Sequence, residues 1–151
     1  MGIRDVIPTL YLRLGRDQEC YDFLKWWATA AKASKYNWGA TSLPYLDVKD
    51  ADVFELSDIF VRRHADLSHN VAVTLIKTRL LLDVKSLQSA AVLGEKVPQE
   101  IVDRIRAQPV SSVVLQNKEI MLSKDRSSLI TELEEQIDEL YSFMDTSNPH
   151  F

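Results

Sequence analysis

Hydrophobic residues recur along this chain at intervals of three and four, the spacing that places side chains on one face of an α-helix. The clearest run predicts a long helix over residues 70–93, with Ser68 before it as an N-cap. The apolar positions of this helix are Val73, Ile76, Leu80, Val84, Leu87 and Ala91. Further leucines widen the stripe, which indicates burial on more than one side. We therefore expect this helix to form the centre of the fold.

A first helix is predicted over residues 17–32, and a long aromatic loop follows it. The residues that share one face of this helix, and that we expect to be buried, are Cys20, Leu24, Trp27 and Ala31. Residues 34–50 then contain Gly39 and Pro44, which interrupt regular structure. A connection of this length is either functional or packed by its own side chains. Its aromatic content favours packing.

Shorter amphipathic segments complete the predicted fold. They cover about residues 52–61, 98–108 and 110–122, and a last helix begins at Ser127 or Ser128. The last helix carries an apolar seam of Leu129, Leu133, Ile137 and Leu140. Four glycines and five prolines are too few for the many turns of an all-β chain. We predict an all-α single-domain bundle of about five or six helices over residues 1–151. Its abrupt apolar end at Phe151 suggests the N-terminal part of a longer protein.

The composition is that of an ordinary globular chain, with 46% hydrophobic and 26% charged residues. A net charge of −4 disfavours binding to nucleic acid, which needs a basic face. No segment approaches the ~20 apolar residues of a membrane-spanning helix. The N-terminus also lacks the apolar core of a signal peptide. We therefore expect an intracellular protein, cytoplasmic or nuclear, that binds neither nucleic acid nor membrane.

Groups that could carry chemistry are few and isolated. Cys20 is the only cysteine, so an internal disulfide and a cysteine-rich zinc site are excluded. We interpret it as a small hydrophobic residue of the first helix. His64 and His69 flank Asp66, but their spacing of five does not place both histidines on one helical face. We interpret them as polar residues around a helix start, and we predict no catalytic residue, metal ligand or cofactor.

The aromatic residues around the first helix allow two interpretations. Trp26 and Trp27 are adjacent, so on a helix their side chains point about 100° apart. One can lie in the core while the other packs under the loop that holds Trp38. In the alternative, one of them lines a groove for a peptide or ligand, because Trp and Tyr are typical interface anchors. The interaction surface that we predict comprises Tyr21, Trp26, Trp38 and Tyr45.

Several stretches of the chain resemble a family of uncharacterised fungal proteins. They read LYLRLGRDQECYDFLKWW, LPYLDVKDADVFE, LSHNVAVTLIKTRLLLDVKSLQ and VPQEIVDRIR, and the resemblance covers nearly the whole chain. For some relatives it implies an association with a MYND-type zinc finger, which is a protein-interaction module. The ligands of such a finger are absent from this chain, because Cys20 stands alone. The resemblance carries over no catalytic residue.

Three functions are compatible with these patterns. The first is a non-enzymatic helical protein-interaction domain of a fungal intracellular protein, which binds through the helix of Trp26 and Trp27 and the loop over residues 36–46. The second is a small-molecule-binding protein or enzyme with a pocket between helices. The convergent polar groups of that pocket would be Arg16, Asp22, Lys25 and His64 or His69. The third is a homodimer built on the apolar seam of the last helix, which spans only about two and a half heptads and is short for an independent coiled coil.

Overall fold

The computed structural model describes residues 2–30, 36–40, 42, 44–62, 66–93, 97–107 and 111–148. Within these residues the chain forms seven α-helices and one short 3₁₀ helix, and no strand. The elements are α1 (Ile3–Arg13), α2 (Asp17–Thr29), η1 (Ser57–Ile59), α3 (Leu67–Leu93), α4 (Gln99–Arg106), α5 (Ser112–Gln116), α6 (Lys118–Leu122) and α7 (Ser127–Ser147). The predicted all-α fold with a long central helix is confirmed.

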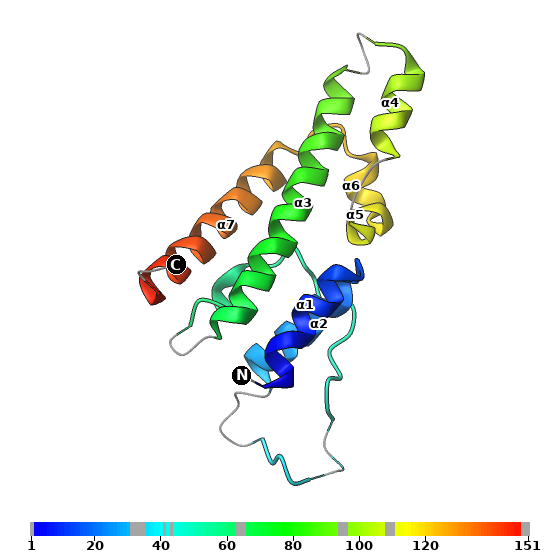
Figure 1. Ribbon diagram of the computed structural model, residues 1–151. Coiled ribbons are helices and arrows are strands. Elements are labelled where there is room, and N and C mark those ends of the chain that lie inside the picture. Colours follow the sequence, from blue (N-terminus) through cyan, green and yellow to red (C-terminus); the bar gives the residue numbers. More distant parts are fainter. Residues whose placement is uncertain are drawn as a thin grey trace.

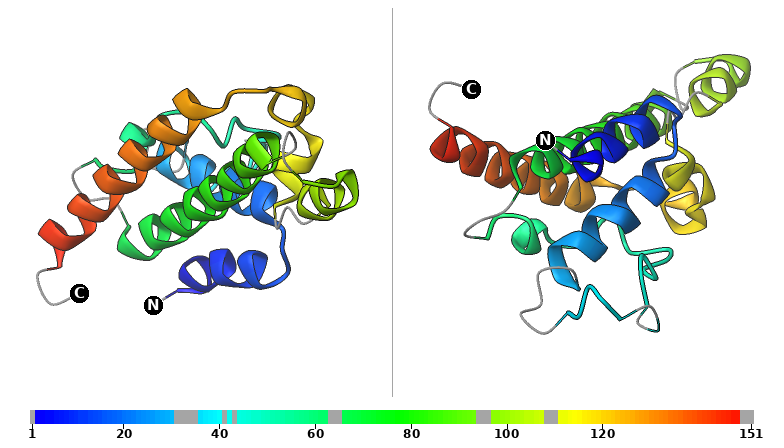
Figure 2. Two further views of the ribbon diagram at one scale, coloured as in Figure 1. Left: turned by 90° about the horizontal axis from the view of Figure 1, so that it is seen from above. Right: turned by 60° about the horizontal axis from the view of Figure 1, so that its bottom comes forward.

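The helices are arranged around α3, which runs most of the length of the molecule (Figure 1). α7 lies antiparallel along one side of α3, while α1 and α2 pack against its N-terminal half (Figure 2). The short helices α4, α5 and α6 gather at the other end. The α3 side chains of Val73, Ile76 and Leu80 are fully buried as predicted, and α7 adds Leu133 and Leu140 to the same core. Packing on several sides buries most of the apolar surface of α3, but two of the leucines that widen its stripe, Leu75 and Leu82, are 43% and 59% exposed.

α3 is 27 residues long and mostly apolar, yet it also buries polar side chains, namely His69, Asn70, Lys77 and Asp83. Burial of a polar group costs free energy unless the group is hydrogen-bonded. The Lys77 ammonium donates to two backbone carbonyl groups, and the Asp83 carboxylate accepts the backbone N–H of Ser111 at 2.7 Å. In the part of the chain that the structure describes, no helix has both the length and the apolar character that crossing a bilayer requires.

The N-terminal helix α1 was not among the predicted helices. It contains Pro8, which has no N–H to donate to the carbonyl oxygen of Arg4, four residues earlier. Nε2 of His69, on α3, lies 3.3 Å from that carbonyl oxygen. The helix therefore continues through Pro8, because a side chain from another helix can satisfy the acceptor that proline leaves open.

The helix predicted over residues 52–61 is wrong in extent, since only Ser57–Ile59 forms a 3₁₀ turn. Val53 is buried. Its carbonyl oxygen and that of Glu55 accept hydrogen bonds from the Lys77 side chain. A lysine from α3 thus replaces the N–H groups that would bond these carbonyls in a helix.

Short polar side chains set two helix starts that differ from the predicted ones. Asn117 divides the helix predicted over residues 110–122 into α5 and α6, because its side-chain oxygen accepts the N–H of Ile120 as an N-cap. At the start of α3, Ser68 lies inside the first turn. The Asp66 carboxylate accepts hydrogen bonds from the Ser68 N–H and hydroxyl. Asp66 therefore acts as the N-cap of α3, the role that was predicted for Ser68.

Candidate functional site

The four residues of the predicted interaction surface divide into two that are buried and two that are exposed. Tyr21 and Trp26 are fully buried, so the prediction that they belong to an exposed interaction surface is wrong. Trp38 and Tyr45 are 56% and 57% exposed. Only the two loop residues of the predicted surface are therefore available to a partner.

Trp26, and not Trp27, is the tryptophan of the core. The spacing of α2 placed Trp27 on the buried face, but this side chain is only partly buried. The connection after α2 folds back over Trp26, where Asp47 accepts the indole N–H at 3.0 Å and the Tyr45 ring lies 4.9 Å away between centroids. The loop thus buries a side of α2 that helical periodicity alone assigns to solvent. Ala31, also assigned to the buried face, lies outside the described residues.

Trp27 links the loop to the N-terminal end of α1. Its ring stacks on that of Trp38, with 5.3 Å between centroids and 21° between planes. From α1, the guanidinium carbon of Arg4 lies 5.5 Å from the centroid of the Trp27 ring, a cation–π geometry. The exposed Trp38 and the first turn of α1 are therefore close neighbours.

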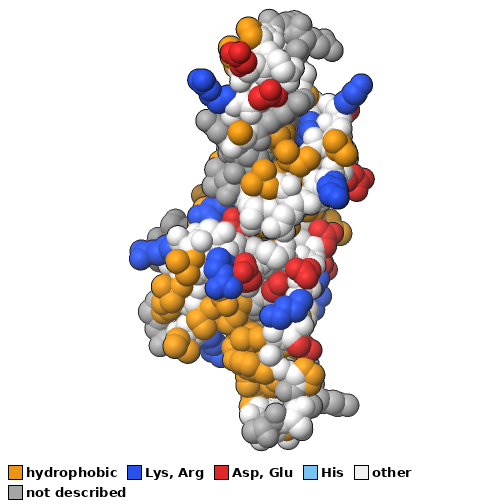
Figure 3. All heavy atoms as spheres, turned by 90° about the vertical axis from the view of Figure 1, so that its right-hand side faces the viewer, with side chains coloured by type: hydrophobic (Ala, Val, Ile, Leu, Met, Phe, Trp, Pro, Cys, Tyr) orange, Lys and Arg blue, Asp and Glu red, His pale blue; other side chains and the backbone are white. Residues whose placement is uncertain are grey.

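α1 and its C-cap present a row of exposed apolar side chains, at the three- and four-residue spacing of a single helix face. They are Ile3, Val6, Leu10 and Leu14. Figure 3 shows hydrophobic side chains gathered over the end of the molecule that holds α1 and the aromatic loop, with basic side chains among them. We use the term apolar face for Ile3, Val6, Leu10, Leu14, Trp38 and Tyr45. The α1 part of it was missed in the sequence, although its spacing was a signal that Pro8 obscured.

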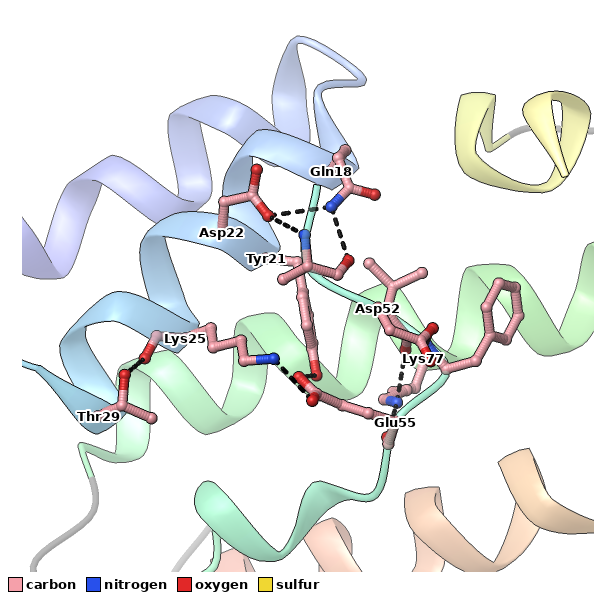
Figure 4. A network of polar contacts seen from close by, with 11 residues as sticks. Gln18, Tyr21, Asp22, Lys25, Thr29, Asp52, Glu55 and Lys77 are labelled. Carbon is pink, nitrogen blue, oxygen red and sulfur yellow. Dashed lines mark hydrogen bonds and ion pairs between the residues drawn. The ribbon is translucent and has the colours of Figure 1, made fainter. Parts of the chain in front are cut away.

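The second half of the α2–α3 connection is held by polar side chains of α2 (Figure 4). The Asp22 carboxylate accepts the backbone N–H groups of Asp50 and Ala51 at 3.0 and 2.9 Å. The Gln18 amide donates both to Asp22 and to the Ala51 carbonyl. These four bonds fix an irregular backbone that has no ladder or helix of its own.

Glu55, further along the same segment, meets side chains from α2 and α3 (Figure 4). The Tyr21 hydroxyl donates to its carboxylate at 2.8 Å, and the Lys25 ammonium pairs with it at 2.7 Å. Lys77 donates to the carbonyl groups of Val53 and Glu55 at 2.6 and 2.7 Å. Burial lowers the pKa of Lys77 to about 8, against the opposing effect of nearby carboxylates. Burial and the hydrogen bond to Glu55 raise the pKa of Tyr21.

A cleft of about 470 Å³ lies between α2, the connection and α5. Its lining includes Tyr11, Arg16, Asp22, Phe23, Lys49 and Gln116. The volume suits a small ligand, and the lining mixes aromatic with charged groups. Leu46 and Asp50, which also line it, have φ angles of 52° and 51°. A leucine seldom occupies this left-handed region, so the packed surroundings impose the conformation.

The cleft contains only part of the pocket that the sequence suggested. Arg16 and Asp22 belong to its lining, as the second function required. Lys25 pairs instead with Glu55, and His69 contacts the Arg4 carbonyl. His64 lies outside the described residues.

Cys20 is closed off from solvent and from reaction. It is fully buried, and its thiol contacts the Pro8 carbonyl oxygen at 3.6 Å. Burial raises the pKa of the thiol to about 12. Since the thiolate is the nucleophile, Cys20 behaves as the small core residue that the sequence predicted.

The apolar seam of α7 is used within the chain. Leu133 and Leu140 are fully buried in the shared core, and Leu129 and Ile137 are partly buried. The seam is therefore not exposed for the contact between two copies that the predicted homodimer requires. The apolar repeat that resembled a coiled-coil contact is the packing of α7 on α3.

Comparisons of the chain with protein-family models, with curated proteins and with solved structures gave no match. The resemblance to fungal proteins stays a prediction.

Proposed function

We propose that this chain is a non-enzymatic protein-interaction domain that binds its partner through the apolar face. The observation that carries the proposal is exposure, because all six side chains of that face are between 41% and 82% exposed. Monomeric soluble proteins rarely expose contiguous apolar patches larger than a few hundred Å², and larger patches mark interaction sites. Trp38 and Tyr45 are of the residue types that dominate binding energy at interfaces.

The charges around this face indicate an acidic partner. The exposed ionic side chains of α1 and the turn after it include Arg4, Arg13 and Arg16, although Arg16 also pairs with Glu19 at 2.9 Å. By contrast, α7 contains six acidic residues and no lysine or arginine. A basic rim beside an apolar centre attracts a partner whose own apolar residues are flanked by carboxylates.

The buried ionisable groups support a binding function in place of a catalytic one. Cys20 is held as a thiol, and Tyr21 and Lys77 are both engaged with the segment around Glu55. The resemblance to fungal proteins, some of them associated with an interaction module, agrees with this proposal.

Affinity capture followed by reconstitution tests the proposal. Partners captured by the wild-type chain would be purified, and their affinity for variants measured by isothermal titration calorimetry. Trp38→Ala and Leu10→Ala should each weaken binding by tenfold or more, because anchor residues contribute at least about 1.4 kcal/mol. The matched controls are Tyr141→Ala on α7 and Leu122→Ala on α6, which are 60% and 81% exposed and lie outside the apolar face. Equal affinity of a partner for all four variants would show that the apolar face is not its docking site.

A second candidate function is small-molecule binding in the cleft beside α2. The observation in its favour is the 470 Å³ volume with Arg16, Asp22 and Lys49 in its lining. A fragment screen by NMR, with Lys49→Ala and Gln116→Ala as variants, tests it. Fragments whose chemical-shift changes fall elsewhere on the protein, or persist in both variants, would exclude the cleft.

A further inference from the structure

Three side chains of metal-ligating type meet where the first turn of α1 approaches the start of α3. Asp5 comes from α1, Asp66 directly precedes α3, and His69 lies in the first turn of α3. One ligand atom from each lies within 4.8 Å of the other two. Ligands of a tetrahedral zinc ion are separated by about 3.4 Å, given metal–ligand bonds of about 2.1 Å. The three atoms therefore lie at most about 1.4 Å further apart than the ligands of a bound zinc ion.

The imidazole of His69 is oriented as in many metal sites. His69 is 6% exposed, and the Phe23 ring packs against it edge to face with centroids 6.1 Å apart. Its Nε2 faces the Arg4 carbonyl, the acceptor that Pro8 leaves open in α1. When Nε2 donates its proton there, Nδ1 carries the lone pair that a metal requires. Donation of the second ring N–H to a carbonyl is the usual way in which proteins fix a metal-binding histidine.

The two carboxylates retain capacity for a cation in addition to their local hydrogen bonds. Asp5 accepts the backbone N–H of Gly2, and Asp66 accepts from Ser68. Each ionised carboxylate offers about four lone-pair positions, so these contacts leave others for a metal. Arg4 lies 3.7 Å from Asp5 and is the competing positive charge.

We propose that Asp5, Asp66 and His69 form a binding site for a zinc-type divalent metal ion at the α1–α3 junction. One imidazole nitrogen and two carboxylate oxygens match zinc, which takes nitrogen and oxygen ligands in a tetrahedral arrangement. Three protein ligands leave the fourth position for water. The ion joins α1 to α3 and thereby fixes the position of the helix that carries four residues of the apolar face. The proposal does not depend on the interaction function.

Titration of the full chain, freed of metal with a chelator, tests the site. Isothermal titration calorimetry with Zn²⁺ should give one saturable site, and Zn²⁺ should raise the thermal unfolding temperature. His69→Gln and Asp5→Asn should each weaken Zn²⁺ binding by tenfold or more. The matched control is Asp138→Asn on the exposed side of α7, which should bind as the wild type does. Co²⁺ in place of Zn²⁺ should give the visible absorption of a four-coordinate ion.

A variant that binds Zn²⁺ more tightly than the wild type separates the loss of a metal ligand from misfolding, because misfolding can only weaken binding. Arg4→Ala removes the competing charge and keeps the backbone carbonyl, so it should bind Zn²⁺ several-fold more tightly. Circular dichroism of each variant with chelator present should match the wild type. Mg²⁺ should not compete, because it prefers octahedral oxygen coordination. Absence of saturable Zn²⁺ binding by the wild type, equal binding by Asp5→Asn, or preference for Mg²⁺ would each overturn the proposal.

Discussion

The two halves of the connection between α2 and α3 are both irregular, yet they are stabilised by different means. The described residues of the first half, 36–40, 42, 44 and 45, are held by aromatic rings that pack on Trp26 and on one another. Residues 46–56 are held by side chains of α2 and α3 that bond backbone groups directly. The first half leaves Trp38 and Tyr45 more than half exposed, whereas the second half encloses Val53 completely.

This difference shows which half can serve a partner. A polar side chain that bonds a buried backbone group is not available to bind another molecule. If it did so, the backbone group would lose its hydrogen-bond partner, at a cost of about 1–3 kcal/mol in stability. Aromatic rings pack with one face and keep the other in solvent. We therefore expect the second half to determine stability and the exposed rings of the first half to determine binding.

The largest effect is expected where the aromatic half reaches the core. Trp26→Ala should lower the free energy of unfolding by about 3–5 kcal/mol, because it leaves a cavity under the loop and removes the partner of Asp47. Urea denaturation followed by circular dichroism measures it. A loss as small as that of an exposed ring would mean that the loop does not depend on Trp26.

Lys77→Met tests the polar half of the connection. Methionine fills much of the same volume but leaves the carbonyl groups of Val53 and Glu55 without their donor. The free energy of unfolding should fall by about 2–4 kcal/mol. Lys85→Met is the matched control, since its exposed pair with Glu134 contributes less than about 1 kcal/mol. A stabilised Lys77→Met protein would show that the apolar exchange outweighs the lost hydrogen bonds.

The same lysine makes stability depend on pH. Its pKa is about 8 in the folded protein, against the ordinary value of 10.5. Between these values the unfolded chain retains a proton that the folded chain has released, so stability rises with pH. The unfolding free energy of the wild type relative to Lys77→Met should rise by about 1 kcal/mol from pH 8 to pH 9. A difference that is flat or falling over this range would contradict the burial of a titrating ammonium.

The smallest effect on stability is expected from the exposed rings. Trp38→Ala should change the free energy of unfolding by only about 1 kcal/mol, the contribution of its stacking on Trp27. Thermal unfolding measures this change, and the double variant with Trp27→Ala separates the stacking from the rest. A large loss would indicate that Trp38 stabilises the fold and is not simply displayed by it.

Helical periodicity predicted the long helices correctly. Each buried face of a long helix packs against a single neighbouring element, so the apolar residues of that face keep a regular helical spacing. Most of the predicted inward positions of α3 and of the α7 seam are buried as expected, although Ala91, Leu129 and Ile137 are only partly buried. α1 was missed because Pro8 argues locally against a helix, and the compensating contact comes from His69, which is distant in sequence. The burial of Trp26 was missed because a loop, which has no period, covers it.

The candidate sites were harder to predict than the fold. Tyr21 and Trp26 have the side-chain types of an interface, but packing decides that they are internal. The group of Asp5, Asp66 and His69 could not be found by spacing, because α1 brings Asp5 to the other two across the fold. Trp38 and Tyr45 alone were correctly placed at the surface, because a loop rich in aromatic residues cannot bury all of them.

The dependence of α3 on α7 has a consequence for biosynthesis. α3 is apolar on most sides, and α7, which covers one of them, is the last of the described helices to leave the ribosome. Until then the nascent chain displays Leu80 and its neighbours without the leucines that later enclose them. Exposed apolar surface of this kind is what chaperones bind and what aggregates. Truncation before α7 should therefore yield an insoluble product, even though it leaves the apolar face intact.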